Sequence, residues 1–146
     1  MSSTLLKTMQ AIGFGILLLV SPLSAGQDHQ FAMQVPFDFV AANHQLSAGD
    51  YTVTSDTATG TVAIRSGYAG PTIVLATYSA GDNKECARAK LVFNQYGNHF
   101  FLSQVWPAGA TGRELRKSRQ EVEIAKTVSR PEVLSVIASG PSKASR

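Results

Sequence analysis

The sequence predicts an all-β protein, mainly antiparallel, folded as a β-sandwich or small barrel of about seven strands with one short C-terminal helix. Apolar and polar side chains alternate without a gap over residues 31–39, which is the period of a half-buried strand. Two further β-type segments flank the pair Gly97-Asn98, which is typical of a tight hairpin turn. Short segments of this kind recur along the chain between turns that contain glycine and asparagine, as in sandwiches and small barrels.

The first 26 residues have the layout of a secretory signal peptide. Lys7 precedes an apolar run over residues 11–20. A helix-breaking pair, Ser21-Pro22, follows the run, and three small residues then occupy positions 24–26. The run is too short to cross a bilayer, which needs roughly 20 residues. We therefore expect cleavage after Ala25 or Gly26 and a periplasmic or extracellular location. The rest would be a single β-rich domain over 27–138 and a disordered tail over 139–146, with no transmembrane segment in the mature chain.

Local patterns predict the strands that precede the hairpin. Residues 31–39 form the first strand, and because Pro36 has no N–H for a ladder, we expect this strand at a sheet edge. Residues 42–45 then predict a connection and 47–50 a tight turn. Three more strands follow from their β-forming residues, over 51–54, 61–64 and 72–78. The last of these is the most uniformly apolar, so we expect it to be covered on both faces.

The hairpin joins 89–96 to 99–106. Glycine at the first turn position suits a type II′ turn, whose twist matches that of the strands. With a two-residue turn, Phe93 opposes Leu102 and Leu91 opposes Gln104. Strict alternation then places Leu91, Phe93, Phe100, Leu102 and Trp106 on the core face. Val105 falls on a second, mixed face, which we expect to be partly covered.

After Pro107 the pattern changes from strand to helix. Ser118 followed three residues later by Glu121 is a capping-box pattern and predicts a short helix over 119–126, with Val122 and Ala125 on one face. A strand remains the alternative for 119–128, because Val122, Ile124 and Val128 also alternate. Residues 132–138 predict the final strand.

Charge singles out one segment. The formal net charge of +3 is too weak to imply nucleic-acid or membrane binding. Four cations nevertheless lie close together, at Arg113, Arg116, Lys117 and Arg119. Arginine forks suit carboxylates and phosphates, so this group predicts a site for an anionic partner. The alternative is an ordinary solvated surface in which Glu114, Glu121 and Glu123 neutralise the cations as local pairs.

The sequence shows no spacing that indicates catalysis, a metal or a cofactor, and we predict none of the three. His29, His44 and His99 are isolated, and no nucleophile elbow or phosphate loop occurs. Cys86 is the single cysteine, either a packed thiol or a link between two chains. An enzyme would need a site assembled only in three dimensions, for example from Asp38, His44, Asp50 and His99.

Several segments form a familiar set: VPFDF at 35–39, LSAGDYTV at 46–53, KLVFNQYGNHFFL at 90–102, and GREL followed by KSR within 112–119. This set resembles a family of small, exported, uncharacterised β-rich proteins of acidobacterial type. The likeness covers nearly the whole mature domain and departs at Ser47, where the family usually has proline. No activity attaches to that family, so the resemblance implies an exported β-rich fold and no catalytic residues.

We therefore expect an exported, non-enzymatic β-domain that acts as a binding or envelope-associated module. Its partner would be an anionic envelope component or another protein, and not a nucleic acid. One alternative is a small hydrolase-like enzyme. Another is a self-assembling structural subunit, with a homodimer formed through Cys86 or through an edge strand such as that of residues 31–39.

Overall fold

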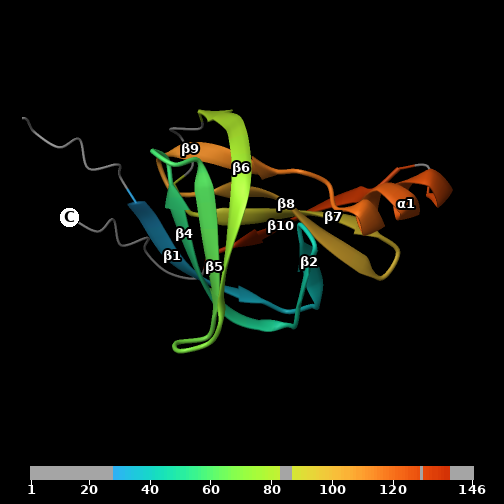
Figure 1. The fold of residues 1–146 in the computed structure, drawn as a ribbon, viewed down its shortest axis with the longest axis horizontal. Coiled ribbons are helices and arrows are strands. Elements are labelled where there is room, and N and C mark those ends of the chain that lie inside the picture. Colours follow the sequence, from blue (N-terminus) through green and yellow to red (C-terminus); the bar gives the residue numbers. More distant parts are fainter. Residues whose placement is uncertain (1–27, 83–86, 129, 139–146) are drawn as a thin grey trace, which may run out of the picture.

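The structure, a computed structural model, describes residues 28–82, 87–128 and 130–138. Strands dominate this part of the chain and a single short helix lies near its C-terminal end, which confirms the predicted fold class (Figure 1). The elements are β1 (Asp28–Val35), β2 (Phe39–Ala41), β3 (His44–Leu46), β4 (Gly49–Asp56), β5 (Thr61–Ser66), β6 (Thr72–Asp82), β7 (Lys90–Tyr96), β8 (His99–Trp106), β9 (Thr111–Leu115), α1 (Arg119–Thr127) and β10 (Glu132–Ile137). The predicted leader, the tail and Cys86 lie outside the described residues, and the division into domains stays a prediction.

The strand count differs from the expected seven because three short strands carry little local signal. β2 and β3 form a small hairpin where the sequence predicted the end of one strand and a connection, and Ala42 makes its turn at a φ of 53°. β9 lies in the segment after Pro107, where we expected no strand. Each of the three is at most five residues long, too short for an alternating pattern to stand out.

The predicted first strand divides at Pro36. Phe31, Met33 and Val35 are buried in β1, which pairs with β4 alone among the described strands and so lies at a sheet edge, as predicted. Beyond Pro36 the chain leaves the sheet that β1 shares with β4. The next strand, β2, pairs in parallel with β8. Phe37 still reaches the core from the connection between β1 and β2, stacking on the ring of Phe100 with centroids 4.0 Å apart.

β6 joins two layers of sheet. Its first half pairs with β5, which continues through β4 to β1. Its second half pairs with β9, and that layer continues through β8 and β7 to β10. Figure 1 shows β4, β5 and β6 crossing the direction of β7 and β8. Side chains of both layers meet in one core, centred on the fully buried rings of Phe39 and Phe93, which contact each other edge to face at 5.3 Å.

The expectation that β6 is covered on both faces is wrong. Leu75 points into the core, but Val74 is 64% exposed and Tyr78 is 56% exposed on the outer face. The apolar run of β6 therefore does not mark a central buried strand. It marks a strand that covers one face of the core while its other face meets solvent.

A β-bulge corrects the predicted hairpin. Phe93 opposes Leu102 as predicted, but the register shifts beyond that pair, so that Leu91 opposes Val105 rather than Gln104. The extra residue exchanges the two faces of the strand after Leu102. Val105 is consequently fully buried in the core. Trp106 lies on the outer face instead, with its ring directly over Gly112, where no Cβ would fit.

The predicted helix is confirmed, and it covers the second face of the hairpin. Ser118 is its N-cap and accepts a hydrogen bond from the backbone N–H of Glu121 at 3.0 Å. Ile124 and Ala125 pack on a small separate cluster formed by Val40, Tyr96 and Phe101. Val122, which we expected on the apolar face, is 43% exposed, because the helix turns Glu121 rather than Val122 toward the sheet.

Candidate anion-binding surface

The connection between β9 and α1 places three cations at the surface. Arg116 and Lys117 are exposed in the connection, and Arg119 is exposed at the first position of the helix. Ser118, between them, is buried as the helix cap and so fixes the backbone on which they stand. We call Arg116, Lys117 and Arg119 the cationic link.

Arg116 is held by an aromatic side chain of β6. Its Nη2 donates a hydrogen bond to the Tyr78 hydroxyl at 2.7 Å, and its guanidinium carbon lies 5.9 Å from the centroid of the Tyr78 ring. Contact with an aromatic face attracts a cation and narrows the range of positions that its side chain adopts. Sequence reasoning missed Tyr78, because only the pairing of β6 with β9 brings the two residues together.

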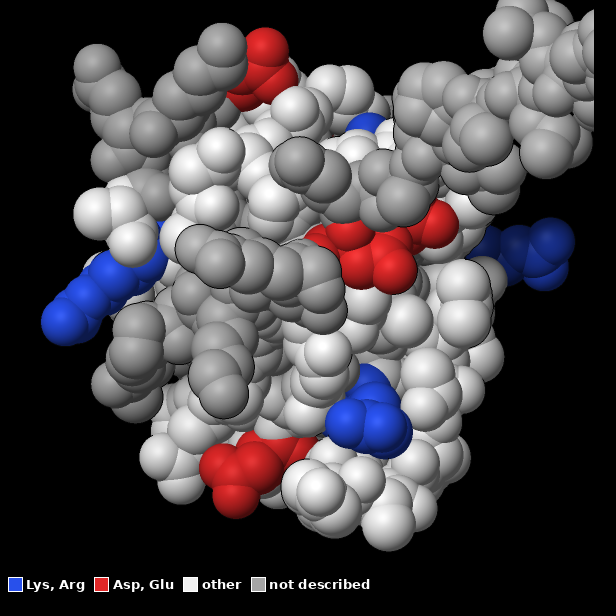
Figure 2. Space-filling view, turned by 90° about the vertical axis from the view of Figure 1, so that its left-hand side faces the viewer, with Lys and Arg blue, Asp and Glu red and all other residues white. Residues whose placement is uncertain are grey.

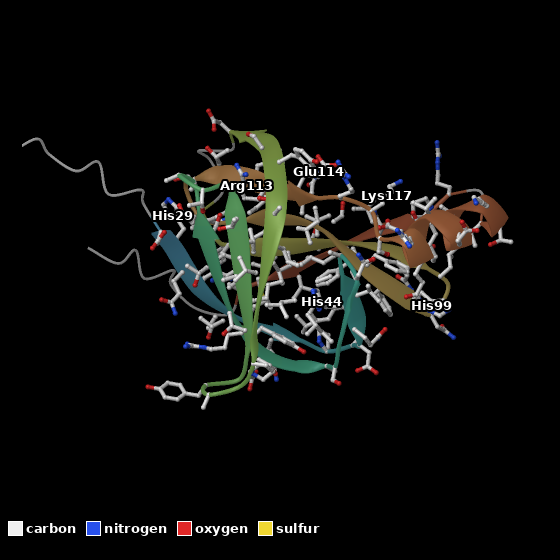
Figure 3. All side chains as sticks on the ribbon, viewed as in Figure 1. His29, His44, His99, Arg113, Glu114 and Lys117 are labelled. Atoms are coloured by element: carbon white, nitrogen blue, oxygen red, sulfur yellow. The ribbon has the colours of Figure 1, made fainter. Side chains whose placement is uncertain are left out.

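Arg113 lies apart from the cationic link. Its side chain is 8% exposed and points to the core face of β9, beside Val105 on the neighbouring strand. Nε donates to the Thr77 hydroxyl oxygen at 2.8 Å and Nη2 donates to the Thr77 carbonyl at 3.0 Å. The Thr77 hydroxyl in turn donates to the Gly60 carbonyl at 2.7 Å. Arg113, labelled where β9 passes β6 in Figure 3, thus ties together the turn after β4, the bend of β6 and β9.

Two of the three acidic residues expected to neutralise these cations have other partners. Glu121 is buried, and its Oε1 accepts from Asn94 Nδ2 at 2.9 Å and from the Tyr96 hydroxyl at 3.3 Å. Burial, followed by the nearby charge and hydrogen bond of Glu121, raises the pKa of Tyr96 above its usual value. Glu123 pairs with Lys126, whose Nζ lies 2.7 Å from the Glu123 Oε1. The third acidic residue, Glu114, lies on β9 and is exposed.

Charge is mixed at the end of the molecule that lies on the left of Figure 1. Figure 2 views this end, where blue basic and red acidic side chains are separated from one another by white residues. No region of a single sign stands out among the described residues that this view shows. The cationic link is therefore not part of a basic surface that extends over this end.

The residues considered for catalysis do not assemble into a site. Asp38, His44, Asp50 and His99 are all exposed, and Asp38 Oδ1 accepts from the backbone N–H of Ala48 at 2.7 Å as a loop brace. Figure 3 shows the three histidines far apart along the molecule, at β1, β3 and the start of β8. A surface hollow of about 330 Å³ contains none of these residues; it is lined by Gln95, Gly97, Val128, Arg130 and Glu132.

The described residues contain neither a metal-binding cluster nor a membrane-spanning helix. They hold no group of three or more histidine, cysteine or acidic side chains placed to bind a metal ion. None of their helices is long and apolar enough to cross a membrane.

Comparison with known proteins adds no relative. No family model matches the chain, and neither the curated proteins nor the solved structures contain a significant match. The resemblance to the exported acidobacterial family therefore stays a prediction from the sequence.

Proposed function

We propose that this chain is an exported, non-enzymatic β-domain that works as a binding or envelope-associated module, and that the cationic link holds an anionic partner. The observation that carries the proposal is the exposure of Arg116, Lys117 and Arg119 within four consecutive positions, with Arg116 fixed against Tyr78. The layout of residues 1–26 supports a periplasmic or extracellular location.

The chemistry of the cationic link suits a polyanion of the envelope better than a single small anion. Guanidinium forks bind carboxylate or phosphate oxygens in pairs, and Lys117 adds a point charge between the two arginines. The three side chains are exposed, so each contact is worth little and is screened by salt. Useful affinity therefore needs several anionic groups that are engaged together.

Retention on phosphocellulose tests the proposal. We expect the double variant Arg116→Gln/Lys117→Gln to elute at clearly lower salt than the unchanged protein. Adding Arg119→Gln to this variant should lower the salt concentration at elution further. The matched control is Lys126→Gln/Arg130→Gln, which removes the same charge from exposed positions outside the cationic link. Equal shifts for the two double variants would show that only net charge matters and would reject the site.

Export is tested separately. When the full chain is expressed in a Gram-negative host, we expect the protein in the periplasm or the medium, with a new N-terminus at Gly26 or Gln27. Recovery of uncleaved chain from the cytosol would reject export without affecting the binding test.

A further inference from the structure

β10 is an edge strand with an apolar outer side. In the described part of the chain it pairs with β7 alone. Leu134 and Val136 face inward and are half-buried, whereas Val133 is 69% exposed and Ile137 is 55% exposed. Edge strands that stay single are commonly protected by lysine or proline, and residues 133–137 contain neither.

The backbone groups that point away from β7 belong to the same outward-facing residues. Ala138 N–H donates to the Ala89 carbonyl at 2.9 Å. In an antiparallel pair the hydrogen-bonded positions alternate, so Leu134 and Val136 also bond to β7. The N–H and C=O groups of the residues between them therefore point to the free edge: Val133, Ser135 and Ile137.

The turn of the β7–β8 hairpin gives the same assignment independently. Tyr96 and His99 flank a two-residue turn and form the closing, hydrogen-bonded pair of that hairpin. The even-numbered residues of β7 adjoining the turn therefore bond to β8, which leaves odd-numbered residues such as Phe93 to bond to β10. Phe93 opposes Leu134, in agreement with the bonding derived from Ala138.

We infer that β10 pairs with β10 of a second copy of this chain, antiparallel about a two-fold axis at Ser135. In this register Ser135 faces Ser135 of the second copy, and Val133 faces Ile137. All three outward-facing residues then form hydrogen-bonded pairs, and each pair contributes two N–H···O bonds. The second layer of the sandwich becomes one sheet that runs through both copies.

The symmetric placing of exposed residues about Ser135 indicates that the partner at the β10 edge is a second copy of this chain. An interface about a two-fold axis must complement itself, so that residue i meets residue j and j meets i. The exposed apolar pair Val133 and Ile137 lies at equal distances from Ser135, and no charge lies between them. Two copies thus bring apolar side chains together without like-charge repulsion. The inference does not depend on the anionic partner, because none of the residues of the cationic link takes part.

Sedimentation of the purified protein tests the dimer. We expect the mass to rise from that of one chain to that of two as concentration is raised from the micromolar to the millimolar range. Ser135→Pro removes an outward N–H that β7 does not use, and Val133→Lys/Ile137→Lys places charges at the edge. Both variants should remain monomeric at every concentration with unchanged far-ultraviolet circular dichroism. Should Ser135→Pro fail to fold, the lysine variant decides.

Two further experiments fix the edge and the register. Ala32→Lys, on the exposed side of the edge strand β1, should leave dimer formation unchanged. In a chain that carries Cys86→Ser, Ser135→Cys should cross-link on oxidation, because facing Cα atoms about 5.5 Å apart lie within disulfide range. Val133→Cys should not cross-link, because its copy lies roughly four residues further along the strand, about 13 Å away.

Three results would overturn the inference. The first is a monomer throughout the concentration range. The second is a dimer that survives the lysine variant or is abolished by Ala32→Lys. The third is cross-linking through residue 133 in preference to residue 135.

Discussion

Arg113→Gln separates a structural cation from a ligand-binding one. The sequence groups Arg113 with the other cations, whereas its contacts place it in the framework that joins β6 to β9. We expect this substitution to lower the free energy of unfolding substantially. The variant should bind phosphocellulose at least as strongly as the single-charge control Lys126→Gln. Arg116→Gln, in contrast, should weaken binding to phosphocellulose and leave the free energy of unfolding nearly unchanged.

The contacts give the expected magnitude. Arg113 makes two hydrogen bonds from a charged group, each worth roughly 1.5–3 kcal/mol in a mutational comparison. The lost bonds act on one residue, Thr77, and water can replace part of them at the margin of the core, so their sum is an upper bound. We expect a loss of about 2–4 kcal/mol. This corresponds to a fall in Tm of roughly 10 °C for a domain of this size.

Urea unfolding followed by circular dichroism measures the change, and Thr77→Val supplies the partner for a double-mutant cycle. Thr77→Val removes the hydroxyl that accepts from Arg113 Nε but keeps the carbonyl that accepts from Nη2. The coupling energy between the two substitutions should be about 1 kcal/mol. A change below about 0.5 kcal/mol for Arg113→Gln, with a loss of retention equal to that of Arg116→Gln, would refute the structural role.

Three other predictions concern the core and its polar groups. Val105→Lys should prevent folding whereas Trp106→Lys should not, because the bulge buries the first side chain fully and turns the second outward. Ser55→Ala should stabilise the protein by about 1 kcal/mol, because the fully buried Ser55 hydroxyl has no hydrogen-bond partner within the described residues. Raising the pH above the ordinary tyrosine pKa of 10.0 should destabilise the fold, and Tyr96→Phe should weaken this dependence.

The sign of the pH effect follows from linkage. Burial raises the pKa of Tyr96, so the folded chain holds that proton more firmly than the unfolded chain does. The resulting stabilisation is complete below the unfolded pKa and is lost as the pH rises through the folded one. Urea midpoints measured across this range check it, and an unchanged slope in Tyr96→Phe would contradict it. For the other two predictions, a destabilised Ser55→Ala or a folded Val105→Lys would be the contrary result.

The local features of the fold could be predicted because neighbours in the chain determine them. The alternation from Phe31 to Val35 depends only on which side chains follow one another, and it predicted the buried face of β1 correctly. The helix cap likewise needs only Ser118 and the backbone of Glu121 three residues on. The turn at Gly97 fixed the hairpin as far as Phe93 and Leu102.

The candidate site was only partly predictable. The sequence showed that four cations lie close together along the chain. Which of their side chains are buried and which are exposed depends on the strands that lie beside β9. Arg113 meets Thr77 across 36 positions of the chain, and Arg116 meets Tyr78 across 38. Neither contact has a trace in the local pattern, and the same holds for the bulge, which depends on what Val105 and Trp106 pack against.

The sequence by itself thus determined the β class, the principal strands, the helix and the segment in which the cations gather. Period, turn residues and caps act over a few neighbouring positions and can be read from the order of residues. Only the tertiary structure decided that β6 joins the two layers, that Arg113 is buried, and that β10 pairs with β7 alone in the described part of the chain, with Val133 and Ile137 exposed. Those facts depend on the free energy of packing distant segments against each other. Each such contact involves two segments, so the residues of one segment alone do not predict it.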